Sequence, residues 1–191
     1  MRTVRVAAGK PYDVYIERGL LDEAGQYLKN ALGHTCKAAI LTDDHVDRLY
    51  GEQTQISFEK AGFDVCRFAI PHGEENKNLT VWTEMLGFLA QNQLTRTDVI
   101  VALGGGVVGD MAGFAASAYL RGIPFMQIPT TLLAMVDSSV VAKPPSTCLQ
   151  ERTLPVRFTS LVWCCVTQTR CGRLRRIFWR TAWRKPSNTV C

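Results

Sequence analysis

Three consecutive glycines, Gly104–Gly106, mark the segment of the chain whose residue types best suit chemistry. They follow the apolar run Asp98–Leu103, which is typical of a strand, and a helix is expected from about Val107 to Tyr119. Glycine lets a backbone approach a ligand closely, and the start of a helix presents unpaired N–H groups and a partial positive charge. The segment therefore suits a phosphate or pyrophosphate. The G-x-G-x-x-G spacing that ends at Gly109 fits a dinucleotide-binding turn, with a purely structural turn as the alternative.

Three further polar loops each follow an apolar run. They are Thr42–Asp44, Pro71–Lys77 and Pro129–Thr131. Helix capping or turn formation would explain any one of these loops by itself. The carboxyl ends of parallel strands lie at the same edge of a sheet, so the four loops together predict a cofactor cleft along that edge.

The elements that must position these loops alternate between strand and helix over the first 140 residues. Apolar or β-branched runs predict strands at Thr3–Val6, Tyr12–Glu17, Ala38–Thr42, Val65–Ile70, Asp98–Leu103 and Phe125–Ile128. Helical spacing predicts helices at Leu20–Ala31, His45–Ala61 and Leu79–Gln91, with Gly33, Gly62 and Asn92 where they stop. The alternation predicts an α/β fold: a Rossmann-like, mostly parallel sheet with helices on both faces.

The overall composition is that of a globular protein. Hydrophobic residues make up 47% of the 191 residues, which excludes a disordered chain, and the 15 glycines exclude a collagen-like repeat. No stretch approaches the roughly 18 uninterrupted apolar residues of a membrane helix. Met1–Lys10 also lacks the basic-then-apolar order of a secretion signal. We therefore expect a soluble, cytoplasmic protein with no membrane partner.

The composition changes near position 140. Residues 1–140 carry 12 basic and 16 acidic side chains, whereas residues 141–191 carry 10 basic side chains and a single acidic one, Glu151. The second segment also holds five of the seven cysteines and three of the four tryptophans. We interpret the chain as an α/β domain over 1–140 and a basic, Cys- and Trp-rich tail over 141–191.

The tail offers two weak functional interpretations. Its arginines and tryptophans would suit nucleic acid, but no recognition module accompanies them, so a nucleic-acid partner is not expected. Its cysteines do not form paired C-x-x-C knuckles of a zinc site. Thr153–Val166 has strand-like character, and no sustained period follows it. We expect an irregular tail, disordered after about residue 143, and free thiols throughout.

Over residues 1–140 the chain resembles the 3-dehydroquinate synthases of the shikimate pathway, which serves aromatic amino acid and chorismate biosynthesis. The resemblance rests on a set of motifs in a fixed order. They are Gly73-Glu74 with Lys77, Gly104–Asp110, Gly113-Phe114, Arg121-Gly122, Pro129–Leu133 and Val136–Val140. Related sugar-phosphate cyclases share much of this set, so the substrate is less firmly implied than the family.

The resemblance implies an N-terminal NAD-binding domain and a helical C-terminal domain that holds a divalent metal, zinc or cobalt. It implies a lyase that converts 3-deoxy-D-arabino-heptulosonate 7-phosphate, a small sugar phosphate, to 3-dehydroquinate and phosphate. NAD takes a hydride from a ring carbinol and returns it within each turnover. Members of the family form homodimers.

The resemblance also implies roles for individual residues. Asp43 would bind the adenosine ribose, Glu74 and Lys77 would line the nucleotide site, and Asp110 would approach the nicotinamide. The other implied cofactor contacts are the pyrophosphate-binding Gly105, Gly106 and Val107, and Thr130 with Thr131. Asp137 and Lys143 would act on the sugar. The structural alternatives are that Asp110 only complements the charge of its helix and that Asp137 only caps a helix.

The resemblance ends just after Val140. The family continues with Gly-Gly-Lys-Thr, whereas this chain reads Val-Ala-Lys-Pro over 141–144. We hypothesise one missing base in the first expected glycine codon, because codons shifted from Val141 onward permit the family order over about 50 positions. The metal ligands are then absent from this chain, whose three histidines all lie before residue 73. We predict an inactive fragment; the alternatives are another sugar-phosphate cyclase, a polyol dehydrogenase, and a non-enzymatic nucleotide-binding fragment.

Overall fold

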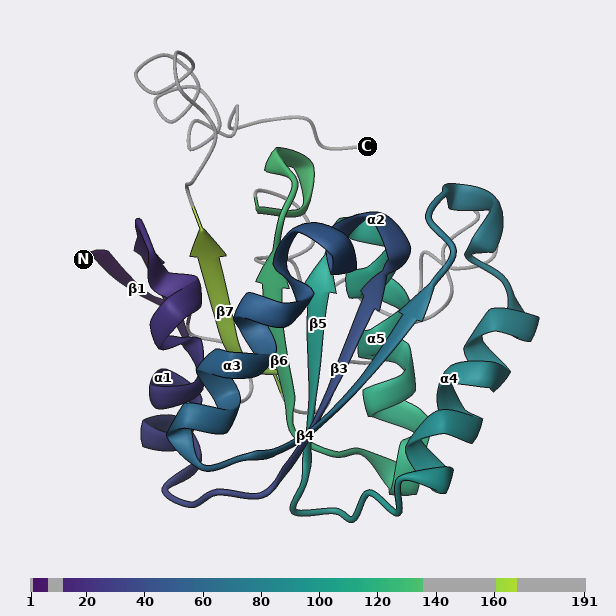
Figure 1. The fold of residues 1–191 in the computed structure, drawn as a ribbon, viewed down its shortest axis with the longest axis horizontal. Coiled ribbons are helices and arrows are strands. Elements are labelled where there is room, and N and C mark those ends of the chain that lie inside the picture. The colour runs from purple at the N-terminus through teal and green to yellow at the C-terminus, as the bar shows by residue number, and fades with distance from the viewer. Residues whose placement is uncertain (1, 7–11, 136–160, 168–191) are drawn as a thin grey trace, which may run out of the picture.

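The computed structural model describes residues 2–6, 12–135 and, for the backbone, 161–167 (Figure 1). Seven strands form one sheet in the order β1-β2-β7-β6-β5-β3-β4. Their bounds are β1 Arg2–Val6, β2 Tyr12–Glu17, β3 Lys37–Asp43, β4 Asp64–Ile70, β5 Val99–Gly104, β6 Phe125–Pro129 and β7 Leu161–Thr167. Every neighbouring pair is parallel except β1 with β2, which pair antiparallel with Val4 opposite Val14.

Within the described ranges, α-helices α1 to α5 connect these strands. Their bounds are α1 Ala24–Leu32, α2 Asp44–Val46, α3 Glu52–Ala61, α4 Leu79–Gln91 and α5 Gly106–Ala118. A 3-10 turn at Leu20–Glu23 precedes α1, and a π-helical turn at Asp47–Gly51 joins α2 to α3. Short 3-10 turns also occupy Glu74–Asn76 and Tyr119–Arg121. Gly33 and Gly62 end α1 and α3 in the left-handed conformation, with φ of 75° and 96°, which glycine adopts without a Cβ penalty.

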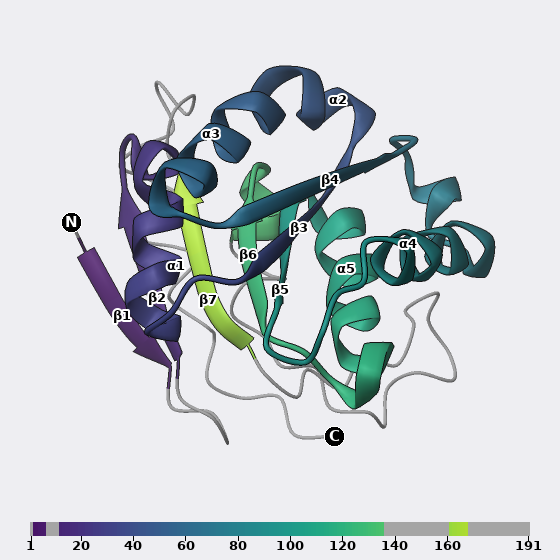
Figure 2. The same cartoon turned by 60° about the horizontal axis from the view of Figure 1, so that its bottom comes forward.

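Helices cover both faces of the sheet (Figure 2), and an apolar core lies on each face. Ile40 of β3 and Val101 of β5 point to the face that α1 and α3 cover. Their chain neighbours Ala39 and Ile100 point to the face that α4 and α5 cover. Strands buried on both faces read as continuous apolar runs, which is why β3 and β5 carry so few polar residues.

The predicted α/β fold, with its mostly parallel sheet covered on both faces, is confirmed. Within the tail, Leu161–Thr167 forms β7 between β2 and β6. This strand overlaps Thr153–Val166, where the sequence had strand-like character, although the tail as a whole was expected to be irregular. Backbone pairing with two neighbours satisfies the N–H and C=O groups of β7. The remaining tail, 141–160 and 168–191, lies outside the described residues, so the domain boundary and the expected disorder stay predictions. None of the helices within the described ranges is long and apolar enough to span a membrane.

Candidate functional site

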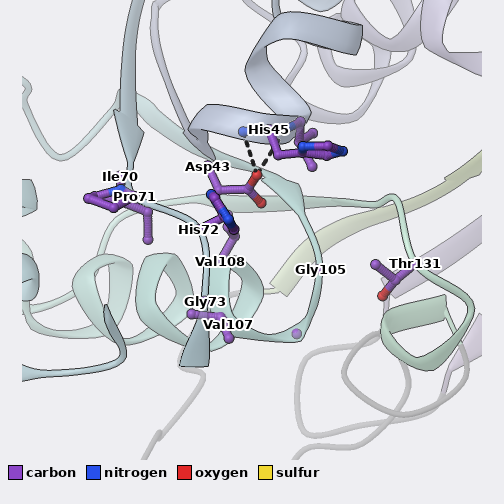
Figure 3. A pocket seen from close by; sticks show the side chains of 12 residues that line it. Asp43, His45, Ile70, Pro71, His72, Gly73, Gly105, Val107, Val108 and Thr131 are labelled. Atoms are coloured by element: carbon purple, nitrogen blue, oxygen red, sulfur yellow. Dashed lines mark hydrogen bonds between the residues drawn. The ribbon is translucent and has the colours of Figure 1, made fainter. Parts of the chain in front are cut away.

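A pocket of about 510 Å³ lies at the carboxyl ends of β3, β4, β5 and β6 (Figure 3). The residues that line it come from the loops after these strands. They are Asp43, His45, Val46, Ile70, Pro71, His72, Gly73, Gly105, Gly106, Val107, Val108 and Thr131. A pocket thus lies at the sheet edge where the four polar loops predicted a cleft.

The glycine turn forms the floor of this pocket. Gly104 has no room for a side chain, because a Cβ there would lie 2.7 Å from Cβ of Val108. A Cβ on Gly105 would lie 3.3 Å from Thr131 Cγ2, closer than most real contacts. A Cβ on Gly106 would meet none of the described atoms within 4 Å, so open space adjoins this backbone. Glycine here keeps the backbone accessible to a ligand.

The helix that starts at this turn has no side-chain cap. Gly105 is the N-cap of α5, in extended conformation, and it lacks a side chain that could accept hydrogen bonds from the first turn. The first N–H groups of a helix have no partner within the helix, and they carry part of the positive end of its dipole. With 13 residues, α5 is long enough for this dipole to attract an anion. The floor of the pocket therefore fits a phosphate group.

Asp43 has the capping role that its position suggested, and its role toward a ribose stays a prediction. Its Oδ1 accepts hydrogen bonds from the backbone N–H of His45 (3.0 Å) and of Val46 (2.8 Å), which caps α2. Within the described part of the chain, no hydrogen bond involves its other oxygen, Oδ2. Figure 3 shows the carboxylate at the pocket, with the capping bonds on one oxygen. One oxygen is thus left to accept a hydrogen bond from a ligand hydroxyl.

Lys77 and Asp110 face each other beside the pocket and do not line it. Lys77 Nζ donates to Asp110 Oδ2 at 2.6 Å and lies 3.8 Å from Glu74 Oε1. The Lys77 side chain is only 9% exposed, and that of Asp110 is 25% exposed. Three residues predicted to contact a nucleotide therefore form an ion-pair network that joins the loop after β4 to α5.

The two threonines after β6 differ in their surroundings. Thr131 lines the pocket, and its Oγ1 accepts a hydrogen bond from Ala134 N at 3.2 Å. Thr130 donates its backbone N–H to Gly104 O at 2.9 Å, which fixes the spacing of the β5 and β6 loops. The Thr130 hydroxyl oxygen is buried, and no group in the described ranges bonds to it. A buried hydroxyl without a partner is unfavourable. Thr130 itself does not line the pocket.

Two histidines at the pocket were not predicted as site residues. His45 and His72 both line it, with ring centroids 6.2 Å apart. His72 Nδ1 lies 2.8 Å from Asp44 Oδ1, and the same oxygen accepts the His72 backbone N–H at 2.9 Å. These hydrogen bonds hold the pKa of Asp44 below its usual value. The only sequence signal was that His72 lies in the predicted polar loop Pro71–Lys77 and that His45 directly follows the polar loop Thr42–Asp44.

The remaining predictions concern the substrate and the metal. Asp137 and Lys143 lie outside the described residues. Among the residues that the structure does describe, no three His, Cys, Asp or Glu side chains come together in a way that could hold a metal ion. The described part of the chain therefore does not fit a divalent metal.

The comparisons with known proteins point to one family. Residues 67–151 match the family model described as the N-terminal domain of 3-dehydroquinate synthase. This match passes the predicted boundary at Val140. A 3-dehydroquinate synthase from Streptococcus pneumoniae is 55% identical over 133 residues, which cover 70% of this chain and 37% of the relative. The chain thus spans little more than a third of the length of this relative.

Solved structures give the same fold. A 2-deoxy-scyllo-inosose synthase superposes with a TM-score of 0.75 at 23% identity, over 86% of this chain and 46% of that one. The 2-epi-5-epi-valiolone synthase from Streptomyces hygroscopicus, solved with NAD+ and Zn2+ bound, gives 0.67 at 28% identity, over 86% and 45%. The glycerol dehydrogenase from Schizosaccharomyces pombe gives 0.57 at 20% identity, over 81% and 36%.

Proposed function

We propose that this chain, which belongs through its N-terminal part to the 3-dehydroquinate synthase family, forms the NAD-binding half of such an enzyme. The observation that carries this proposal is the pocket at the ends of β3 to β6, with the uncapped start of α5 as its floor. The family match and the 55% identity support it, and a structural relative at 28% identity was solved with NAD+ bound.

Each wall of the pocket has a role toward the dinucleotide. The backbone N–H groups of Gly106 and Val107 donate to the pyrophosphate, which the start of α5 also attracts. The free oxygen of Asp43 accepts a hydrogen bond from a hydroxyl of the adenosine ribose. Thr130 and Thr131 close the cleft on the β6 side. When bound, NAD supplies the hydride acceptor of the reaction.

The ion-pair network of Lys77 with Glu74 and Asp110 does not line the pocket, but it holds the loop that does. Asp110 holds Lys77, and Lys77 fixes the end of the loop that carries His72 and Gly73. We therefore assign Glu74, Lys77 and Asp110 a positioning role. A direct contact of these residues with the nicotinamide or the ribose is a further prediction from the resemblance.

Substitution of Gly106 tests the proposal without disturbing the fold. A Cβ there meets no described atom within 4 Å, so the melting temperature of Gly106→Ala should change little. A methyl group obstructs the pyrophosphate, and a carboxylate repels it. We expect isothermal titration of NAD to show at least about a tenfold weaker affinity for Gly106→Asp, equal to about 1.4 kcal/mol. Gly87→Ala, at an exposed position of α4 with open surroundings, is the matched control.

Two results would contradict the assignment of NAD to this pocket. One is that the unsubstituted chain shows no heat of NAD binding at millimolar concentration. The other is that Gly106→Asp binds NAD as tightly as Gly87→Ala does. Either result would leave the family membership intact and remove the proposed site.

We further propose that the complete reaction, release of phosphate from 3-deoxy-D-arabino-heptulosonate 7-phosphate, is not performed by this 191-residue chain. The proposal is supported by two observations. The described residues contain no group of His, Cys, Asp or Glu side chains that could hold a metal ion. The three histidines of the chain all precede residue 73. A phosphate-release assay with added zinc or cobalt should give no signal above background. Measurable turnover would contradict it.

The frame shift after Val140 is the proposed reason for this loss. It is supported by the change to 10 basic and one acidic side chain over 141–191. Sequencing the coding DNA around codon 141 tests it directly, because one inserted base should restore the family order. An unshifted gene that matches the printed sequence would contradict it.

The structural relatives favour a second candidate substrate. The 28% identical 2-epi-5-epi-valiolone synthase is a different enzyme, so a related sugar phosphate is the alternative to the heptulosonate. The 55% identity to a 3-dehydroquinate synthase makes the heptulosonate our first choice. We also propose a cytoplasmic location and, for the complete enzyme, a homodimer, as the resemblance implies.

A further inference from the structure

Asp44 joins two segments that flank the pocket. It belongs to α2, which begins where β3 ends, and its partner His72 belongs to the loop after β4. Asp44 Oδ1 accepts two hydrogen bonds from His72, one from the ring Nδ1 at 2.8 Å and one from the backbone N–H at 2.9 Å. The bond from the backbone fixes the start of the loop, and the bond from the ring fixes the direction of the side chain.

The Asp44 carboxylate has a second partner on its own segment. Arg48, in the π-helical turn after α2, lies 3.7 Å from Asp44 Oδ2, the other carboxylate oxygen. The two residues are four positions apart, which makes them neighbours on the surface of a helix. This contact helps to keep Oδ1 directed toward His72.

The bonds to His72 also determine where the next residue, Gly73, lies. His72 O accepts a hydrogen bond from Asn76 Nδ2 at 2.9 Å, so the backbone of His72 is bonded through both its N–H and its C=O. Gly73 follows with φ of 115°, which favours glycine, and a Cβ there would overlap the Glu75 carboxylate. The position of the Gly73 backbone therefore depends on where His72 is held.

The loop after β4 is anchored near both of its ends. Asp44 holds its start through His72, and Asp110 holds its end through Lys77, with 2.6 Å between Nζ and Oδ2. Between these anchors, His72 and Gly73 line the pocket (Figure 3). A loop that has lost one anchor is ordered only when a ligand binds, and this ordering lowers the affinity.

We propose that Asp44 is a positioning residue for the dinucleotide: through His72, it holds Gly73 at the pocket wall before NAD binds. This inference rests on the proposed function, since it takes NAD as the ligand of the pocket. Asp44 itself does not line the pocket, so it acts through the loop and not through a contact with the ligand. A wall that is already in place loses less conformational entropy on binding.

The charge of Asp44 and its hydrogen bonds have opposite effects on NAD binding. The pyrophosphate of NAD is negative, so loss of a nearby carboxylate strengthens binding by electrostatics alone. Loss of the hydrogen bonds to His72 weakens binding, because the loop is then released. Asp44→Asn removes the charge and keeps an oxygen that accepts hydrogen bonds, whereas Asp44→Ala removes both.

The experiment measures the dissociation constant of NAD for the full chain by isothermal titration, together with the melting temperature of each variant. Asp44→Ala should bind NAD about threefold to tenfold more weakly than the unsubstituted chain, as expected for hydrogen bonds lost at a partly exposed site. Asp44→Asn should restore the affinity to within about twofold. Because the Asp44 side chain is 38% exposed, neither substitution should shift the melting temperature by more than about 2 °C.

Asp22→Ala is the matched control. Asp22 is exposed, its Oδ1 accepts a side-chain hydrogen bond from Gln53 Nε2 at 2.6 Å, and it does not line the pocket. Its affinity for NAD should follow that of the unsubstituted chain. Hydrogen exchange in a peptide covering residues 71–77, measured without NAD, should be faster in Asp44→Ala than in Asp44→Asn or Asp22→Ala.

The outcomes distinguish this inference from the proposed function. If the unsubstituted chain does not bind NAD, the proposed function fails and this inference fails with it. If NAD binds, and Asp44→Ala binds it as tightly as Asp22→Ala does, the inference alone is overturned. Equal losses of affinity in Asp44→Ala and Asp44→Asn would also overturn it, because the hydrogen bonds would not be the cause. Failure of Asp44→Ala to fold, or equal exchange of the loop in Asp44→Ala and Asp22→Ala, would likewise contradict the positioning role.

Discussion

Lys77 Nζ lies 2.6 Å from Asp110 Oδ2, across 33 residues of sequence. Lys77 ends the loop after β4, and Asp110 sits in the second turn of α5, so the ion pair ties together two walls of the pocket. The Lys77 side chain is 9% exposed. A charge this buried needs its partner, and the pair therefore contributes to both the stability and the shape of the site.

Removing the lysine should destabilise the fold. Lys77→Met leaves Asp110 without its cation, and we expect the free energy of unfolding in urea to fall by about 1–3 kcal/mol, because water still reaches part of the carboxylate. Lys60→Met, at an exposed position of α3, should change it by less than about 0.5 kcal/mol. A double variant Lys77→Met with Asp110→Leu should recover part of the loss. Equal effects of the two single lysine variants would show that the ion pair has no structural role.

The contact between α1 and α3 depends on Gly25. A Cβ there would lie 2.7 Å from Phe58 Cα, and backbone cannot move aside as a flexible side chain can. Gly25→Ala should therefore lower the free energy of unfolding by about 1–3 kcal/mol. Gly87→Ala should raise it by about 0.5–1 kcal/mol, since alanine favours a helix and the space around Gly87 is open. A stabilising Gly25→Ala would mean that the two helices are not packed this closely.

At the opposite edge of the sheet, Asp98 organises the start of β5. It is 8% exposed and accepts hydrogen bonds from Lys37 N (2.8 Å), Thr95 N (2.6 Å) and Thr95 Oγ1 (2.8 Å). Asp98→Ala should cost about 2–4 kcal/mol in chemical denaturation, because these donors lose a charged acceptor. Asp64→Ala removes an exposed carboxylate 3.7 Å from Lys37 and should cost less than about 1 kcal/mol. The assignment is wrong if the two variants unfold at the same urea concentration.

Two half-buried thiols should react slowly in the folded chain. Burial raises the pKa of Cys36 and of Cys66 to about 11. Iodoacetamide at pH 8.5, followed by peptide mass spectrometry, should therefore label both much more slowly without urea than with it. Because each folded pKa lies above the ordinary value of 9.0, the associated stability is present below pH 9 and is lost as the pH rises toward 11. Equal labelling with and without urea would contradict the burial of these thiols.

Local patterns in the sequence were enough to predict most of the elements. The bounds of β2 and α4 were predicted to the residue, because alternation and helical spacing depend only on neighbouring side chains. Gly33 and Gly62 marked the ends of α1 and α3, since the left-handed C-cap favours glycine. The location of the pocket also followed, because parallel strands bring their carboxyl ends to one edge.

Contacts between distant segments could not be predicted in this way. Nothing in the spacing of Lys77 and Asp110 indicates that they pair with each other, and the resemblance placed both at the nucleotide. The bond between Asp44 and His72 likewise joins positions 28 apart. Such pairs depend on how two loops meet, which is set by the packing of whole helices against the sheet.

The position of β7 shows most clearly the difference between what local patterns predict and what contacts between distant segments decide. The sequence indicated strand character within Thr153–Val166, but it contained no sign that Leu161–Thr167 would lie between β2 and β6. A strand bonds through its backbone, which is the same in every residue but proline, so its own side chains do not specify its neighbours. The sequence by itself therefore determined the elements and the edge that carries the site. The order of the strands and the partners of each charge were decided only by the tertiary structure, because they arise from hydrogen bonds and packing between segments far apart in the chain.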